Sequence, residues 1–216
     1  MQQFTASLET LKSSWESALQ PFEVEPKLIQ KVFLDLVRAY SSVGRFYHTL
    51  EHIQHILEII EQMRSLAVNF PTIQLAAWFH DVIYDSKAKD NEERSTDYAV
   101  MSLTKLKIPS TTVERVRRLI LSTKTHQTLL TDIDNQIFLD SDLAILGSSE
   151  WEYQVYAQAI RKEYSWLGSE LYRTDREQVL VKFLQRDRIF FTNQMFVKLE
   201  QRARENMQAE LAAVLA

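Results

Sequence analysis

A histidine followed directly by an aspartate stands inside one of the most apolar stretches of the chain. His80 and Asp81 lie in the sequence AAWFHDVIYD, on a predicted helix with hardly any polar face. A carboxylate buried there is costly unless a cation or strong hydrogen bonds compensate its charge. A divalent metal would satisfy both side chains, because neutral imidazole and carboxylate are standard metal ligands. A buried, hydrogen-bonded His–Asp pair is the alternative.

Three of the five histidines fall within eight residues, in the sequence YHTLEHIQH. On a helix, at about 100° per residue, His48, His52 and His55 occupy one stripe about 60° wide. His52 lies at the edge of the apolar stripe and faces the core, whereas His55 lies toward the rim. A structural, hydrogen-bonded histidine is the simpler interpretation of His55.

Two aspartates lie among apolar residues further along, in the sequence FLDSDLAILG. Two positions apart on a helix, Asp140 and Asp142 diverge by about 200°, so we expect only one of them to point inward. The other would be a capping or surface carboxylate. Spacing alone leaves open which of the two is which.

The elements that position these residues are expected to be helices. The chain of 216 residues has only 3 glycines and 4 prolines, whereas a β-rich or loop-rich fold needs many more residues suited to turns. Helical periodicity and end signals predict helices over about 4–19, 26–40, 49–66, 72–84, 90–104, 111–122 and 138–146, then one or two long helices over 175–216 with a break near 187. Gly147 would follow a helix end.

Capping-box spacings predict where four helices begin. The pairs are Asp90 with Glu93, Thr111 with Glu114, Ser149 with Glu152, and Thr174 with Glu177. We find no internal repeat or linker. We therefore expect one all-α domain over 1–216, with a metal-site core at about 26–147 and a C-terminal helical cover at about 149–216.

The composition excludes several kinds of protein and site. No cysteine is present, which rules out disulfides, thiolate zinc sites and cysteine nucleophiles. The net charge of −4 argues against a protein that mainly coats nucleic acid. The N-terminal residues lack the pattern of a secretory signal, and the most apolar stretch, around 75–84, is too short to span a bilayer. We expect a soluble, cytoplasmic protein that binds neither a nucleic acid polymer nor a membrane.

An ordered set of motifs covers nearly the whole chain: YHTLEH, WFHDVIYD, DNEERS, THQ, FLDSDLAILG, IRKEY and ARENMQAE. The order H…HD…D across separate helices resembles the HD superfamily of metal-dependent phosphohydrolases, and the full set resembles a small bacterial branch of it. The resemblance implies an HD-type helical bundle with additional C-terminal helices. It also implies a divalent metal held by His52, His80, Asp81 and a final aspartate.

In this resemblance the final aspartate is Asp142, with Asp140 as the alternative. Only one histidine, His126, lies between the HD pair and the final aspartate, and it could reach the metal or a second metal. One divalent ion is therefore the simpler expectation; manganese, magnesium, cobalt, nickel, zinc and iron all remain candidates.

The first motif is also similar to that of cyclic-nucleotide phosphodiesterases, in which the earlier histidine protonates the leaving oxygen and the later one binds metal. This similarity implies that His48 is a general acid and His52 a ligand. Thr49 stands where those enzymes carry asparagine, and their second histidine motif after the HD pair is absent. Activity on cyclic nucleotides therefore does not follow.

Two further acidic residues are candidates for the chemistry. Asp85, one helical turn after Asp81, would share its face and could orient a water or a ligand histidine; a helix-end carboxylate is the equal alternative. Glu92 is the candidate general base, because Glu93 has a capping role. Three basic residues could contact phosphate, although solvated charge is the simpler interpretation of each: Arg45, Lys124 and Arg161.

These inferences predict an enzyme that cleaves a phosphoester of a small molecule by metal-activated water. Nucleotides are one candidate substrate class, and a homodimer is left open. The alternatives are an HD-fold di-iron oxygenase, a non-catalytic metal- or ligand-binding HD protein, and a helical interaction protein without metal.

Overall fold

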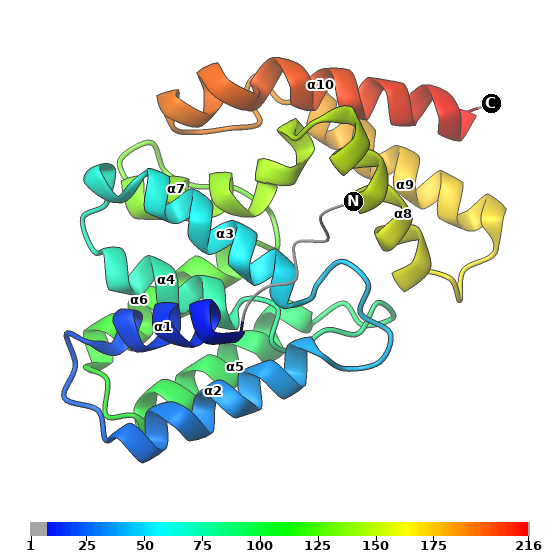
Figure 1. Ribbon diagram of the computed structural model, residues 1–216. Helices are drawn as coiled ribbons and strands as arrows, with labels where there is room; N and C mark the ends of the chain where they lie inside the picture. The colour runs from blue at the N-terminus through cyan, green and yellow to red at the C-terminus, as the bar shows by residue number, and fades with distance from the viewer. Residues whose placement is uncertain (1–7, 216) are drawn as a thin grey trace.

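Helices joined by short connections make up the computed structural model, which describes residues 8–215 (Figure 1). No strand occurs in this part of the chain, so the predicted all-α class is confirmed. The elements are α1 Leu8–Leu19, α2 Pro26–Tyr40, α3 Leu50–Gln62, η1 Arg64–Leu66, α4 Phe70–Phe79, α5 Asn91–Lys105, α6 Ser110–Ser122, α7 Ile133–Asp142, η2 Leu143–Gly147, α8 Glu150–Glu163, α9 Ser169–Leu184 and α10 Asn193–Leu215.

Most predicted helices occur close to their expected bounds. The range 26–40 is reproduced by α2, which has Pro26 in its first turn, where the missing N–H costs nothing. The predicted break near 187 separates α9 from α10. The first four residues of the helix expected over 4–19 lie outside the described residues.

Only one of the four expected capping boxes forms as predicted. At α8, the Ser149 side chain accepts from the backbone of Glu152, whose carboxylate accepts from the backbone of Ser149. The Asp90 side chain makes no capping bond, and Glu93 instead pairs with Lys124. The α6 helix has Pro109 as its N-cap and no side-chain cap, while residues 174–177 lie inside α9.

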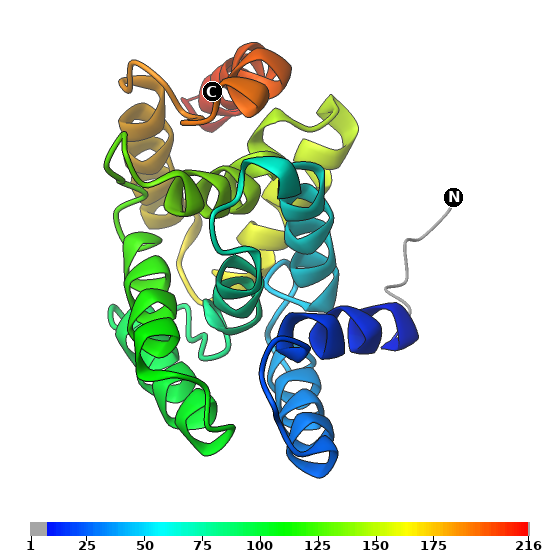
Figure 2. The same ribbon diagram turned by 90° about the vertical axis from the view of Figure 1, so that its left-hand side faces the viewer.

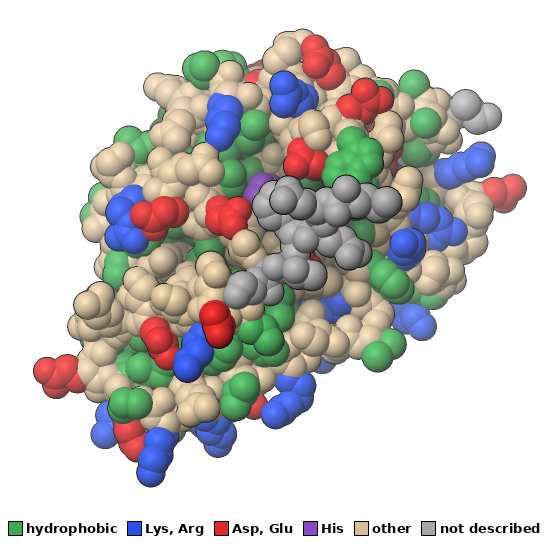
Figure 3. Space-filling view, viewed as in Figure 1, with side chains coloured by type: hydrophobic (Ala, Val, Ile, Leu, Met, Phe, Trp, Pro, Cys, Tyr) green, Lys and Arg blue, Asp and Glu red, His purple; other side chains and the backbone are tan. Residues whose placement is uncertain are grey.

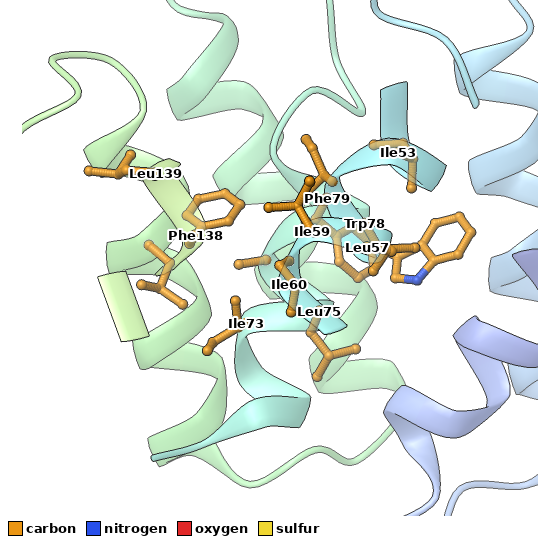
Figure 4. Packing of buried hydrophobic residues seen from close by; sticks show 14 of the residues in the cluster. Ile53, Leu57, Ile59, Ile60, Ile73, Leu75, Trp78, Phe79, Phe138 and Leu139 are labelled. Atoms are coloured by element: carbon orange, nitrogen blue, oxygen red, sulfur yellow. The ribbon is translucent and has the colours of Figure 1, made fainter. Parts of the chain in front are cut away.

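Helix α4 is the centre of the core. Every residue from Thr72 to Phe79 is buried, and α4 packs against α1, α3, α6 and α7. In Figure 4 its side chains, Trp78 among them, gather with those of Ile60 from α3 and Phe138 from α7. Burying a large apolar side chain contributes about 1.5–3 kcal/mol, so this packing fixes where the C-terminal end of α4 lies.

Helix α4 ends at Phe79, five residues earlier than expected, and contacts from distant segments hold the backbone that follows it. The Arg45 guanidinium donates to the backbone oxygens of Asp81 at 2.7 Å and Val82 at 2.9 Å. The next residue, Ile83, is held against α5, where its N–H donates to Ser95 Oγ at 3.1 Å. The chain therefore leaves the helix just where the His–Asp pair stands.

The C-terminal helices gather at one end of the molecule, and α1 and α2 lie at the other (Figure 1, Figure 2). Helix α10 packs along α9 and η2, and α8 also contacts η2. Gly147 ends η2 and has a packing role rather than a left-handed capping role. A Cβ atom at this position would lie 2.6 Å from Leu199 Cβ and 2.8 Å from the Leu199 backbone oxygen.

On the face shown in Figure 3, acidic and basic side chains are interspersed rather than gathered by sign. Outside the grey atoms, this face has no continuous basic track of the kind that a nucleic acid backbone requires. Within residues 8–215, no helix has both the length and the apolar character needed to cross a bilayer.

The close approach of η2 and α10 leads to a stability prediction. Replacing Gly147 with alanine should lower the free energy of unfolding by about 1–3 kcal/mol, because the new methyl group must displace α10 backbone. Chemical denaturation measures this change. Gly168→Ala is the matched control, since a Cβ there meets no atom within 4 Å, and its effect should stay within about 0.5 kcal/mol. Equal effects of the two substitutions would contradict the packing role.

Candidate metal centre

Four polar side chains from three helices converge beside the core. His52 comes from α3, His80 and Asp81 follow α4, and Asp142 ends α7. His80 Nε2 lies 3.3 Å from His52 Nε2, 3.1 Å from Asp81 Oδ2 and 3.5 Å from Asp142 Oδ1. His52 Nε2 lies 3.4 Å from Asp142 Oδ1. We call these four residues the cluster.

These separations suit a shared cation. Metal bonds to histidine nitrogen and carboxylate oxygen are about 2.0–2.2 Å long, which keeps neighbouring ligand atoms roughly 3.0–3.5 Å apart. The four shortest separations within the cluster run from 3.1 to 3.5 Å. The ligand atoms of His52, His80 and Asp81, two buried and one partly buried, all lie within 4.8 Å of one another, and this group could hold a metal ion. Asp142 is not part of that group and joins the cluster through its contacts with the two histidines.

The hydrogen bonds of the two imidazoles give an independent test of the fit. His80 Nδ1 lies 2.9 Å from the Ala77 backbone oxygen, so Nδ1 carries a proton and Nε2 is the nitrogen that faces the cluster, where it can donate to a carboxylate when protonated or bind a metal when neutral. His52 likewise turns Nε2 into the cluster, and its Nδ1 is buried without a hydrogen-bond partner in the described part of the chain. With each imidazole facing the carboxylates through Nε2, the donor set of imidazoles and carboxylates fits a divalent cation.

The charges within the cluster also favour a cation. Burial opposes the ionisation of Asp81, but His80 and His48 hold the pKa of its carboxyl below the ordinary value. Burial likewise opposes ionisation of Asp142, whose hydrogen bonds to His126 and His52 keep its pKa low. Burial would lower the pKa of His80, yet the Asp81 charge and the Asp142 hydrogen bond raise it well above its ordinary value. Without a metal, the charges of His80 and His48 compensate the two carboxylates; a bound divalent cation would supply this positive charge instead.

The two neighbouring aspartates face different parts of the molecule. Asp140 accepts hydrogen bonds of 2.7 Å from the backbone N–H groups of Phe191 and Thr192 and from the Thr192 hydroxyl. Burial raises the pKa of Asp140 to about 6 despite these bonds. Its carboxylate thus holds the segment that begins α10, whereas the Asp142 carboxylate lies in the cluster.

His126 contacts the cluster from its outer side. It follows α6 in a left-handed backbone conformation, with φ of 48°, and its Nε2 lies 3.0 Å from Asp142 Oδ2. Arg186 holds this loop by donating to the backbone oxygens of Thr125 and His126, each at 3.0 Å. Asp142 therefore turns one oxygen toward His52 and His80 and the other toward His126.

His48 stands beside the cluster, joined to a carboxylate that sequence analysis missed. Its Nε2 lies 3.8 Å from Asp81 Oδ2, and its Nδ1 lies 2.7 Å from Glu163 Oε2. Burial would lower the pKa of His48, but Asp81 and Glu163 raise it. Glu163 stands in the last turn of α8, where an acidic side chain opposes the helix dipole. Glu163 belongs to the IRKEY motif, but that motif gave it no role, and its unfavourable position in the helix is the one local physical signal that could have marked it.

Among the described residues, no hydrogen bond or ion pair joins the two other acidic candidates to the cluster. Asp85 is exposed in the loop after α4, and its carboxylate accepts from the Lys87 backbone N–H at 2.9 Å. The premise that it shares a helix face with Asp81 is wrong, because α4 has already ended. Glu92 lies in the first turn of α5 and is partly buried.

The three basic residues considered for phosphate are engaged in the fold. Arg45 donates to three backbone oxygens, of His48, Asp81 and Val82. Lys124 pairs with Glu93. Arg161 donates to the backbone oxygens that follow α8, which leaves it a helix-end role.

Comparison of the chain with protein-family models, with curated proteins and with solved structures gave no match in any of the three. Resemblance to the HD superfamily therefore remains an inference from the motifs.

The division between the two aspartates predicts distinct effects of two matched substitutions. Asp142→Asn should lower metal affinity at least about 100-fold, since losing a ligand costs more than the roughly 10–100-fold typical of losing a ligand's outer partner. Asp140→Asn should retain the metal but lower the free energy of unfolding by about 1–3 kcal/mol, because an amide N–H would face backbone donors. Calorimetric titration measures the metal affinity, and chemical denaturation measures the free energy of unfolding. Loss of metal binding in Asp140→Asn with retention in Asp142→Asn would refute the assignment of Asp142 to the cluster.

Glu163 predicts a pH dependence of stability. Its pKa is lowered from 4.5 to about 2, with burial opposing and the His48 and backbone hydrogen bonds causing the decrease. A carboxylate with a lowered pKa stabilises the fold above its unfolded pKa, and this contribution is lost as the pH falls through the folded pKa. Glu163→Gln should therefore cost roughly 2 kcal/mol at pH 7, with the difference from wild type shrinking between about pH 4.5 and 2. Denaturation with chelator present measures both curves, and a constant difference would contradict the assignment.

Proposed function

We propose that the protein is an HD-type metal-dependent phosphohydrolase, in which His52, His80, Asp81 and Asp142 hold one divalent ion and His48 is the general acid. The observation that carries the proposal is an imidazole placed next to the ligand set. His48 Nε2 lies 3.8 Å from Asp81 Oδ2, while its other nitrogen is bonded to Glu163. A purely structural metal site has no need of such a neighbour.

The exposure of the side chains supports an approach for substrate from one side. The His52 and His80 side chains are 2% and 1% exposed, whereas those of His48 and Asp81 are each 18% exposed and that of Asp142 is 13% exposed. A substrate therefore reaches the cluster on the side that carries both carboxylates and His48.

The residues divide the reaction between them. A bound divalent ion would supply a water of lowered pKa and would polarise the phosphoryl oxygens. The carboxylates of Asp81 and Asp142 and the two imidazoles hold that positive charge in place. The water loses one proton to solvent as its oxygen bonds to phosphorus; the bond to the leaving group breaks, and protonated His48 gives its Nε2 proton to the departing oxygen. General acid catalysis of this kind contributes about 10²–10⁴-fold.

The substrate class and the oligomeric state of the protein are predictions from the sequence alone. A small phosphorylated molecule, with nucleotides as one candidate class, is the expected substrate, and a homodimer is left open. Two irons per chain with an oxygen-dependent product would indicate a di-iron oxygenase. Stoichiometric metal without turnover would indicate a binding protein.

The proposed function predicts that metal binding and hydrolysis are lost together. His80→Ala and Asp81→Ala should each remove the metal and lower hydrolysis at least about 100-fold. Elemental analysis and a screen of phosphate monoesters and diesters against several divalent metals, with chelator controls, measure both. His55→Ala is the control, because it removes a histidine of α3 that lies outside the cluster. Full metal content in the His80 variant would overturn the site, and an inactive metal-loaded wild type would overturn the hydrolase.

A further inference from the structure

We infer that Glu163 is the positioning residue of His48: it holds a proton on His48 Nδ1 and turns Nε2 toward the cluster. The inference rests on the proposed function for its catalytic consequence, although the placement of the proton can be measured without activity. It assigns a part in the site to the C-terminal helical cover, since Glu163 ends α8.

The carboxylate of Glu163 is surrounded by donors. Its side chain is fully buried, and Oε1 accepts from the backbone N–H groups of Phe46, Tyr47 and His48 at 2.8, 2.8 and 3.0 Å. The other oxygen, Oε2, accepts from the Tyr84 hydroxyl at 2.9 Å and meets His48 Nδ1 at 2.7 Å. An ionised carboxylate only accepts hydrogen bonds, so the proton of the last contact belongs to His48 Nδ1.

Aromatic neighbours fix the plane of the His48 ring. The Tyr84 ring stacks on it with centroids 4.2 Å apart and planes at 28°, and the Tyr47 ring meets it edge-on at 5.0 Å. With one face covered by Tyr84 and Nδ1 bonded to Glu163, Nε2 is the ring nitrogen that remains for a molecule in the site. Glu163 thus determines both which nitrogen acts and where it points.

The same contacts tie the cover to the loop that carries His48. Ser86 Oγ donates to the Glu163 backbone oxygen at 2.9 Å, and Trp166 Nε1 donates to Ser86 Oγ at 2.9 Å. The end of α8 is therefore fixed to the segment after Asp81 as well as to residues 46–48. Burying the Glu163 carboxylate is costly unless its hydrogen bonds to residues 46–48 and Tyr84 form. These bonds therefore favour a single position of α8 against that loop.

Glu163→Gln in the full chain separates positioning from folding. The amide oxygen can still accept from the three backbone N–H groups, but the amide nitrogen faces His48 Nδ1 as a donor. We expect kcat to fall about 10²-fold or more for esters with a poor alkoxide leaving group, which need a proton, and less than about 10-fold for 4-nitrophenyl esters, which do not. KM and metal content should stay near those of wild type.

Two controls remove the structural explanation. In a His48→Ala background the additional effect of Glu163→Gln should vanish, because a residue that acts through His48 has nothing left to position. Tyr84→Phe removes the other side-chain donor to Oε2 and keeps the ring stack, so its effect should be small and the same for both ester classes. Equal losses for both classes in Glu163→Gln, persisting without His48, would overturn the inference.

A nitrogen-15 spectrum of the histidine rings in zinc-loaded protein tests the proton directly, whether or not the esters are hydrolysed. When its ring is neutral, His48 should carry its proton on Nδ1 in wild type and on Nε2 in Glu163→Gln; the form that acts as general acid carries a proton on both nitrogens. An unprotonated Nδ1 in wild type would overturn the inference while leaving the hydrolase proposal intact. Correct proton positions with no ester hydrolysis would overturn the hydrolase proposal alone.

Discussion

The cost of placing charge against an apolar core governs this structure. Asp81 and Asp142 are ionised side chains beside helix α4, whose residues from Thr72 onward are buried. Such charges are tolerated only when paired or bound to a cation. The imidazoles of His52 and His80 meet these carboxylates with their nitrogens 3.1–3.9 Å away. Every other element of the site serves to hold these four groups together.

Local sequence predicts the parts of the site that depend on local structure. His80 and Asp81 stand out because polar side chains are costly to bury in so apolar a segment. Helical spacing alone places His52 on the buried side of α3. Helix bounds followed from proline and glycine usage, as the agreement at Pro26–Tyr40 illustrates. The expectation that Asp85 shares a helix face with Asp81 failed because of a contact with a residue far away in the sequence. Arg45 binds the backbone of Asp81, just after α4, from 36 residues away, and no periodicity within residues 72–84 encodes that contact.

Long-range contacts also explain what sequence left open or missed. The choice between Asp140 and Asp142 depends on residues 191–192, which supply the donors that occupy Asp140. Glu163 joins His48 across 115 positions; the local sequence marks it only by the IRKEY motif and by an acidic side chain at the unfavourable end of a helix. The C-terminal helices are therefore more than a cover, because the carboxylate that holds His48 belongs to them.

The central claim is that the four residues of the cluster surround one cation. A crystal structure of the metal-loaded protein, with anomalous scattering recorded at the absorption edge of the metal, tests it most directly. The account predicts one peak about 2.0–2.2 Å from His52 Nε2, His80 Nε2, Asp81 Oδ2 and Asp142 Oδ1, with His48 Nε2 outside bonding distance. A peak elsewhere, or none at saturating metal, would contradict it.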